Sequence, residues 1–232
     1  MTGTITPHLV VNSRMLHFCW LPADPEAVSA LVPDGLKPLP NRQVFMNQYV
    51  VDDLLQTSSV GAYSVTYLGI DLDGADSGDI SVTTTDDGEE IPRRWWNHYL
   101  SSSPAIRDYA LSRGIAARTG STRIEINGTE LVATTESDGV ELIRTVAHVG
   151  RPAERVSRGQ IHYLSDLDGE RIVGHYPFVL EPVEEFEIRS LEFLAPGHPV
   201  YDLRPANPLG LMWGSYSPRS SFACPGGGWA SR

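Results

Sequence analysis

Residues 14–21 read RMLHFCWL, and both alternating sets of side chains in this run are largely apolar. A strand would carry Leu16, Phe18 and Trp20 on one face and Met15, Cys19 and Leu21 on the other. A strand that is apolar on both faces is buried on both, as in a barrel wall that helices or another subunit cover from outside. The run therefore predicts a wall strand of a β-barrel.

Most other segments are short, rich in Val, Ile, Thr and Tyr, and separated by turn signals such as Asn127-Gly128 and Asp168-Gly169. The expected strands are residues 9–21, 43–51, 61–70, 123–127, 130–135, 140–149, 160–164, 171–179 and 183–194. We therefore expect a mainly β (α+β) protein. Residues 1–232 should form one domain, an antiparallel β-barrel or cone, with a disordered tail from about residue 221.

Two helices should interrupt the strands. Asp24 caps a short helix that ends before the PDG turn at residues 33–35. Ser103 caps a longer helix, expected over residues 103–113, which Gly114 should end at its C′ position. We expect this second helix to pack outside the barrel.

Charge excludes two classes of partner. The 29 acidic and 18 basic residues give a formal net charge of −11, which disfavours contact with nucleic acid phosphates and anionic membrane surfaces. Residues 1–13 lack a basic stretch followed by an apolar one, so we expect a cytoplasmic protein. Cys19 and Cys224 stand alone, without metal-ligand spacing, and no metal or cofactor is expected.

No common catalytic motif is present: the chain contains no G-x-S-x-G, G-x-G-x-x-G, P-loop or H-E-x-x-H sequence. The acidic stretch at residues 71–87 lacks the spacing of a calcium loop, so we expect a solvated loop there.

Two blocks of sequence carry a resemblance to a known family. The first is Ser13-Arg14 followed by DPEAV at residues 24–28 and LVPDGL at 31–36; the second runs from YL at 99–100 through PAI at 104–106 to GIAARTG at 114–120. In order and spacing they resemble the acetoacetate decarboxylase-like superfamily. The resemblance implies a β-barrel or cone that encloses a substrate cavity, and assembly into homo-oligomers.

The chain departs from this family at the residue that carries the chemistry. Family decarboxylases form a Schiff base on the first lysine of a P-K-K-L-G segment, and Ala117 stands at that position, followed by Arg118. An arginine does not replace the amine, because its guanidinium stays protonated. The only lysine, Lys37, falls in the turn after the first helix and should be exposed.

The resemblance implies a pocket built around Arg14, the one family pocket residue that keeps its identity. Arg14 and Arg118 would form an anion clamp, and Asn47 and Val65 would replace two family glutamates. Asn47 would hydrogen-bond a carbonyl oxygen. The alternative for Arg14 is a structural ion pair, or a strand-end side chain that reaches water.

Further candidates follow from strand parity. Tyr63, Val65 and Tyr67 share one face, so two phenols would either line the cavity or pack as ordinary core. Five histidines lie in or beside expected strands and could act as acid or base: His17, His98, His148, His162 and His175. His98 is the preferred candidate because it directly precedes the YL block at 99–100, whereas His17 has parity opposite to Arg14 and should face away from the cavity.

Two functions remain open. The first is an enzyme of specialised, polyketide-like metabolism that acts on a small keto or carboxylic acid without an imine, as a lyase, dehydratase, cyclase, isomerase or non-covalent decarboxylase. Arg118 and Asn47 would stabilise an oxyanion in that site. The second is a binding protein that sequesters or senses a small acidic metabolite.

Overall fold

The computed structural model describes residues 7–73, 83–84, 90–224 and 229–230. Its helices are α1 (Pro25–Ala30) and α2 (Pro104–Leu111), with 3-10 turns η1 (Leu54–Gln56) and η3 (Pro199–Leu203). Its strands are β1 (His8–Trp20), β2 (Val44–Val51), β3 (Tyr63–Leu72), β4 (Thr83–Thr84), β5 (Glu90–Ile91), β6 (Arg93–Ser101), β7 (Ala117–Thr119), β8 (Ser121–Asn127), β9 (Glu130–Ser137), β10 (Val140–Val149), β11 (Ser157–Leu167), β12 (Glu170–Glu181), β13 (Phe186–Phe193), β14 (Leu211–Cys224) and β15 (Trp229–Ala230).

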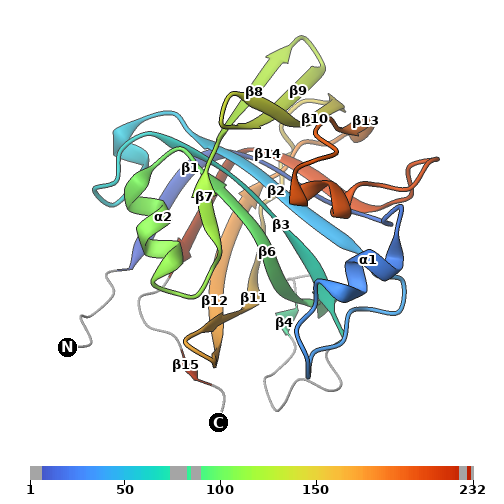
Figure 1. Ribbon diagram of the computed structural model, residues 1–232. Helices are drawn as coiled ribbons and strands as arrows, with labels where there is room; N and C mark the ends of the chain where they lie inside the picture. The colour runs from blue at the N-terminus through green and yellow to red at the C-terminus, as the bar shows by residue number, and fades with distance from the viewer. Residues whose placement is uncertain (1–6, 74–82, 85–89, 225–228, 231–232) are drawn as a thin grey trace.

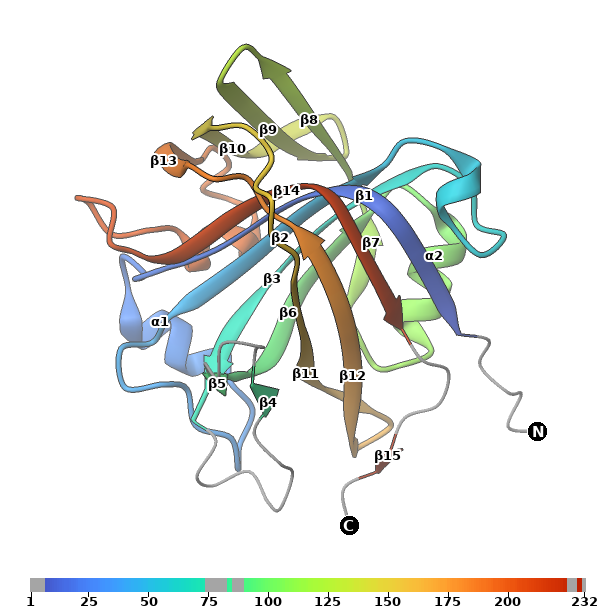
Figure 2. The same cartoon turned by 180° about the vertical axis from the view of Figure 1, so that it is seen from behind.

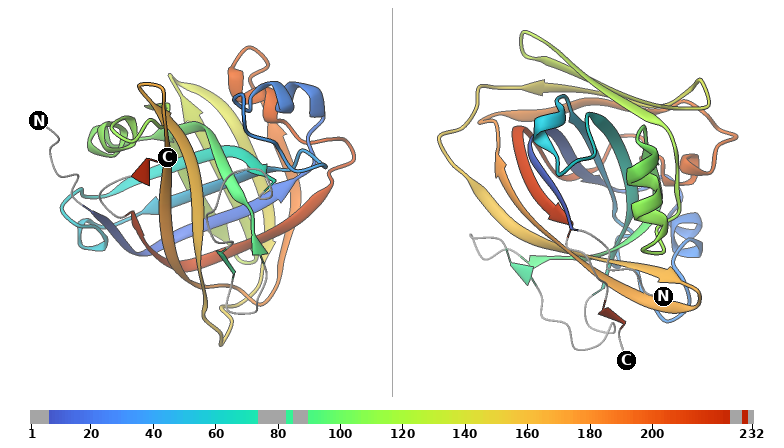
Figure 3. Two further views of the ribbon diagram at one scale, coloured as in Figure 1. Left: turned by 90° about the horizontal axis from the view of Figure 1, so that it is seen from below. Right: turned by 90° about the vertical axis from the view of Figure 1, so that its left-hand side faces the viewer.

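Seven strands close into a barrel, in the order β11-β12-β14-β1-β2-β3-β6, with β6 pairing back to β11 (Figures 1 and 3). Figure 2 shows from behind how β11 and β12 complete the ring between β14 and β6. Neighbouring strands are antiparallel except at the closure, where β6 and β11 run parallel, and β7 adds a short parallel pairing to β6. The expected barrel is confirmed, and the two parallel pairings were not expected.

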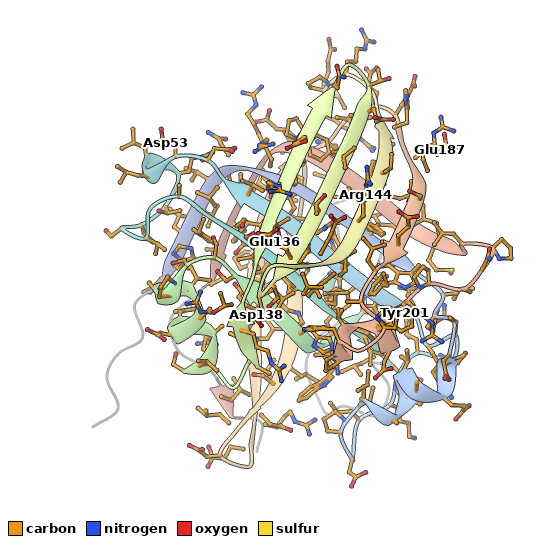
Figure 4. The ribbon with its side chains drawn as sticks, turned by 45° about the horizontal axis from the view of Figure 1, so that its top comes forward. Asp53, Glu136, Asp138, Arg144, Glu187 and Tyr201 are labelled. Carbon is orange, nitrogen blue, oxygen red and sulfur yellow. The ribbon has the colours of Figure 1, made fainter. Side chains whose placement is uncertain are left out.

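A second sheet covers the barrel from outside. It has the order β13-β10-β9-β8 and lies over β1, β2 and β3 at the top of Figure 1. Figure 4 turns this sheet toward the viewer, with the exposed Arg144 labelled on it. The cover over the second apolar face of β1 is therefore a sheet of the same chain, and not helices or another subunit as predicted.

The two faces of β1 belong to two different cores. Leu16, Phe18 and Trp20 pack with residues of the outer sheet such as Leu131 and Ile143. Met15 and Cys19 point the other way, into the barrel interior. The face that points into the barrel therefore determines which candidate side chains of this strand can reach the interior.

The helices begin as expected. The Asp24 side chain accepts from the backbone N–H of Ala27 at 3.0 Å, and Ser103 caps α2. Gly114 has the expected left-handed φ of +71°, although α2 ends at Leu111, two residues earlier than predicted. A Cβ on Gly114 would also meet the backbone carbonyl of Asp166. The helix contributes Ile106 and Ala110 to the interior cluster, so it covers one end of the barrel interior.

Several local predictions are corrected. Strands β6 and β14 were not expected, and residues 221–224, assigned to a tail, belong to β14. Asp71, assigned to a solvated loop, is buried in β3; the rest of that loop lies mostly outside the described residues, as do residues 225–228 of the predicted tail. No helix among the described residues has the length and hydropathy that spanning a bilayer requires.

Candidate functional site

A cavity of about 320 Å³ lies inside the barrel. Its polar side comes from β1, β2, β3, β6 and the residue before β2, and consists of His17, Gln43, Asn47, Asp71 and Arg94. Its apolar side comes mainly from β11, β12 and β14 and includes Ile161, Phe178, Leu180 and Trp213. A cavity of this size, apolar with a few convergent polar groups, is typical of small-molecule sites.

A buried ion pair anchors the polar side. Asp71 and Arg94 are cross-strand neighbours on β3 and β6, and Arg94 Nε donates to Asp71 Oδ1 at 3.0 Å. Gln43 Nε2 and Cys19 Sγ also donate to the Asp71 carboxylate. Burial raises the pKa of Asp71, while Arg94 and Gln43 lower it. With three donors around it, the carboxylate is held as the fixed partner of Arg94.

His17 lies next to this pair. Its Nε2 is 2.9 Å from Arg94 Nη1, and its ring packs edge-on against Trp213 at a centroid distance of 5.0 Å. Arg94 in turn stacks over the Phe45 ring, 4.4 Å from its centroid. Burial and the charge of Arg94 lower the pKa of His17 well below its ordinary value. The imidazole is therefore neutral at physiological pH.

Asn47 lies across from His17 in the pairing of β1 with β2. Its Nδ2 donates to Tyr67 Oη at 2.9 Å and to Met15 Sδ at 3.3 Å. Its Oδ1 is buried and has no hydrogen-bond partner among the described residues. A buried carbonyl oxygen without a donor is rare in folded proteins, and here it belongs to a residue of the cavity wall.

Aromatic side chains fill the other half of the barrel. Tyr67 stacks on Trp96 with ring centroids 4.4 Å apart, and Trp96 stacks on Tyr163 at 4.3 Å. The void among these rings has a volume of only about 10 Å³. Ala117, paired with Tyr99, packs against this cluster. The position that carries the lysine in the resembled family therefore lies against packed rings and does not line the cavity.

The face of Tyr63, Val65 and Tyr67 points inward, and its side chains pack as core and do not line the large cavity, which is the second of the two alternatives. Tyr63 Oη is 2.7 Å from His8 Nε2 and within hydrogen-bond distance of Tyr49. Burial raises the pKa of both Tyr63 and Tyr67, so their phenols stay protonated. None of the three residues lines the large cavity; Tyr67 is connected to it by the hydrogen bond that it accepts from Asn47.

The expected clamp is not present. Arg14 points out of the barrel, where its guanidinium makes a bidentate ion pair with Asp52 and donates to the backbone carbonyl of Ile124. Arg118 is exposed on β7. Neither arginine lines the cavity. Of the three residues predicted to converge there, only Asn47 lines it.

The two histidine assignments are also reversed. His17 faces the cavity and His98 does not. His98 pairs with Leu68 across β3 and β6 and lies 6.5 Å from the ring of His198. The physical reason is that β1 is apolar on both faces, so its pattern does not say which face is the interior.

Sequence reasoning missed Asp71, Arg94 and His17. One signal was available for Asp71, because it continues the alternating face that begins at Tyr63 and Tyr67. Arg94 had no comparable signal, since β6 is bulged between the two residues that oppose Leu68 and Gly69.

Several solved structures have a fold similar to that of this chain. A structure from structural studies of acetoacetate decarboxylase superposes with a TM-score of 0.66 at 15% identity, covering 97% of this chain and 89% of that one. Acetoacetate decarboxylase from Legionella pneumophila gives 0.64 at 12% identity, with 97% and 87% covered. The enduracididine biosynthesis enzyme MppR, complexed with pyruvate, gives 0.64 at 11% identity, with 99% and 91% covered.

No family model matches the chain, and no curated protein matches it. The similarity in structure nevertheless extends over almost the whole chain and over most of each relative. Together with the closed seven-stranded barrel and its internal cavity, it shows that this protein has the acetoacetate decarboxylase-like fold.

Proposed function

We propose that this protein is an enzyme that acts on a small carbonyl compound, such as a keto acid, inside the barrel cavity and without an imine. The observation that carries the proposal is the polar side of the cavity, where Arg94, held by Asp71, and the neutral His17 lie beside apolar walls. Buried donors next to an apolar surface are suited to stabilising an oxyanion.

Such a site supports enolate chemistry. In a β-keto acid the bond between Cα and the carboxylate carbon breaks, CO₂ leaves, and the electron pair moves to the ketone oxygen; the enolate then takes a proton from water. Arg94 replaces Arg118 as the cationic donor in this scheme. Dehydration and cyclisation of carbonyl compounds pass through related oxyanions, so the same donors would serve lyase, cyclase or isomerase reactions.

Imine formation has no support in the cavity. Ala117 cannot form a Schiff base, and Lys37, the only lysine, is exposed in the loop after α1. The relatives include biosynthetic enzymes, and one of them, MppR, is complexed with pyruvate. This makes keto acids of specialised metabolism the first compounds to test as substrates.

A lysine-free variant tests the mechanism. Lys37→Arg removes the only side-chain amine, so CO₂ release from β-keto acids such as benzoylacetate should be unchanged. Borohydride treatment with the keto acid should leave the intact mass unaltered. Arg94→Gln, which removes the cationic donor, should lower the rate at least 100-fold, as loss of a single oxyanion donor does in other enzymes. A borohydride adduct, or loss of activity in Lys37→Arg, would contradict the proposal.

A second candidate is a binding protein, and one observation favours it. Asp71 is the only carboxylate that the described residues contribute to the cavity wall. It already accepts from Arg94, Gln43 and Cys19, so it is poorly placed to remove a proton. Tight binding of keto acids with no CO₂ release and no exchange of Cα hydrogens in deuterated water would favour this alternative over the enzyme.

A further inference from the structure

Arg94 determines which nitrogen of His17 carries the proton. A guanidinium is protonated at every physiological pH and can only donate. Because Arg94 Nη1 is 2.9 Å from His17 Nε2, this contact is a hydrogen bond only if Nε2 accepts. The single proton of the neutral ring is then on Nδ1.

The surroundings oppose a second proton on the ring. A proton on Nε2 would point at Arg94 and place two cations in contact. The other ionisable groups near the ring are Asp71, which Arg94 already pairs, and Cys19, whose thiol pKa burial raises. Tyr176 on β12 also lines the cavity, and its phenol pKa is raised by burial. The nearby Asn47, Trp213 and Phe45 carry no charge.

The free edge of the ring belongs to the cavity. His17 lines the cavity. Its side chain makes one hydrogen bond to a described residue, the contact of Nε2 with Arg94, so Nδ1 has no partner among these residues. Edge-to-face packing on Trp213 and Phe45 fixes the plane of the ring. The imidazole therefore offers one oriented N–H donor, and no basic nitrogen, to a ligand.

We propose that His17 Nδ1–H and a free N–H of Arg94 form a two-donor site for the carbonyl or enolate oxygen of the ligand, and that Asp71 is the positioning residue for both. The substrate class rests on the proposed function, whereas the tautomer follows from the contact with Arg94 alone. In this arrangement His17 is a catalytic hydrogen-bond donor and not the base of the reaction.

The probe for this site is benzoylacetone, a neutral 1,3-diketone whose ionisation places a negative charge on an enolate oxygen. Two N–H donors aimed at that oxygen should stabilise the enolate more than the neutral ketone, because hydrogen bonds to charged acceptors are the stronger ones.

Nitrogen NMR of histidine-labelled protein tests the tautomer directly. Between about pH 6 and pH 8, His17 should show a protonated Nδ1, an unprotonated Nε2 and no titration. The His17→Asn variant assigns the signal. A protonated Nε2, or a titration of His17 in this range, would overturn the proposal.

The enolate absorbance of bound benzoylacetone tests the donor role. In the original protein the pKa of the bound diketone should fall by at least one unit relative to water. His17→Asn keeps an N–H near the position of Nδ1 and should retain most of this shift; His17→Leu should lose it. Equal shifts in both variants would overturn the proposal. Loss of the shift in His17→Leu alongside no turnover of any keto acid would support the donor site and contradict only the proposed enzyme.

Discussion

Arg14 has a structural role in this fold, and its replacement tests that role. The side chain links β1 to Asp52 beyond β2 and to the backbone of β8, with about a third of its surface exposed. Arg14→Met should therefore lower the free energy of unfolding by about 1 kcal/mol, measured by urea denaturation, and leave binding of the anion benzoylacetate unchanged. Arg189→Met, which removes an exposed pair with Glu187, is the control and should cost less than about 0.5 kcal/mol. Reduced binding of benzoylacetate by folded Arg14→Met would show instead that Arg14 belongs to an anion clamp.

Single residues were the least predictable part of the molecule. Asn47 could be placed in the cavity wall from the resemblance. Alternation put Tyr63 and Tyr67 on one face but did not decide whether that face points inward. Arg14 and His17 exchanged roles because the interior and exterior faces of β1 are equally apolar. Only the fold of residues far along the chain, in the outer sheet, decides between those faces, and no local pattern contains that information.

At the scale of elements, a polar network joins the barrel to the outer sheet. Gln48 on β2 donates to Thr135 on β9 at 2.9 Å and accepts from Thr145 on β10 at 3.2 Å. Thr66 on β3 bonds both Thr135 and Thr122 on β8, each at 2.6 Å. All of these side chains are buried, so the sheets meet through a small polar cluster inside an apolar core.

Breaking this network should be costly. Gln48→Met keeps the length of the side chain but leaves the buried Thr145 hydroxyl without its partner and removes one hydrogen bond of Thr135, so the free energy of unfolding should fall by about 2–3 kcal/mol. Thr145→Val in the same chain should cost less than it does alone, because its partner is already gone. Chemical denaturation of the two single variants and the double variant measures this coupling. Additive effects would show that Gln48 and Thr145 act independently.

Elements were predicted well where hairpins alternate cleanly and poorly where interior groups are polar. The turns at Asn127-Gly128 and Asp168-Gly169 join β8 to β9 and β11 to β12 as expected. Strand β6 begins with two arginines, and β14 contains a proline and several serines, so neither shows the β-branched pattern of a strand. Their pairing partners, and not their own propensities, make them strands.

At the scale of the whole molecule, the two halves of the barrel interior differ. Stacked aromatic rings fill one half, and the Asp71–Arg94 ion pair and the cavity occupy the other. Rigid walls and a packed half hold Arg94 and His17 in place, which a site that stabilises charge requires. The resemblance in sequence predicted the barrel, but it could not reveal that the half beside Ala117 is filled.

Buried histidines should make the stability of the whole protein depend on pH. Burial lowers the pKa of His8, His98 and His162 to about 4 each, whereas an unfolded histidine titrates near pH 6.5. Between these values the unfolded chain binds more protons than the folded one, so stability falls as the pH drops from about 6.5 toward 4. From about pH 7.5 to pH 5, the deeply buried His98 should cost up to about 2 kcal/mol. His98, outside the cavity, provides the test: in His98→Gln the fall in unfolding free energy between these pH values should be smaller than in the original chain by about that amount. Carboxylates contribute equally to both proteins, so the difference isolates His98. An unchanged pH dependence in His98→Gln would show that this histidine is protonated in the folded state.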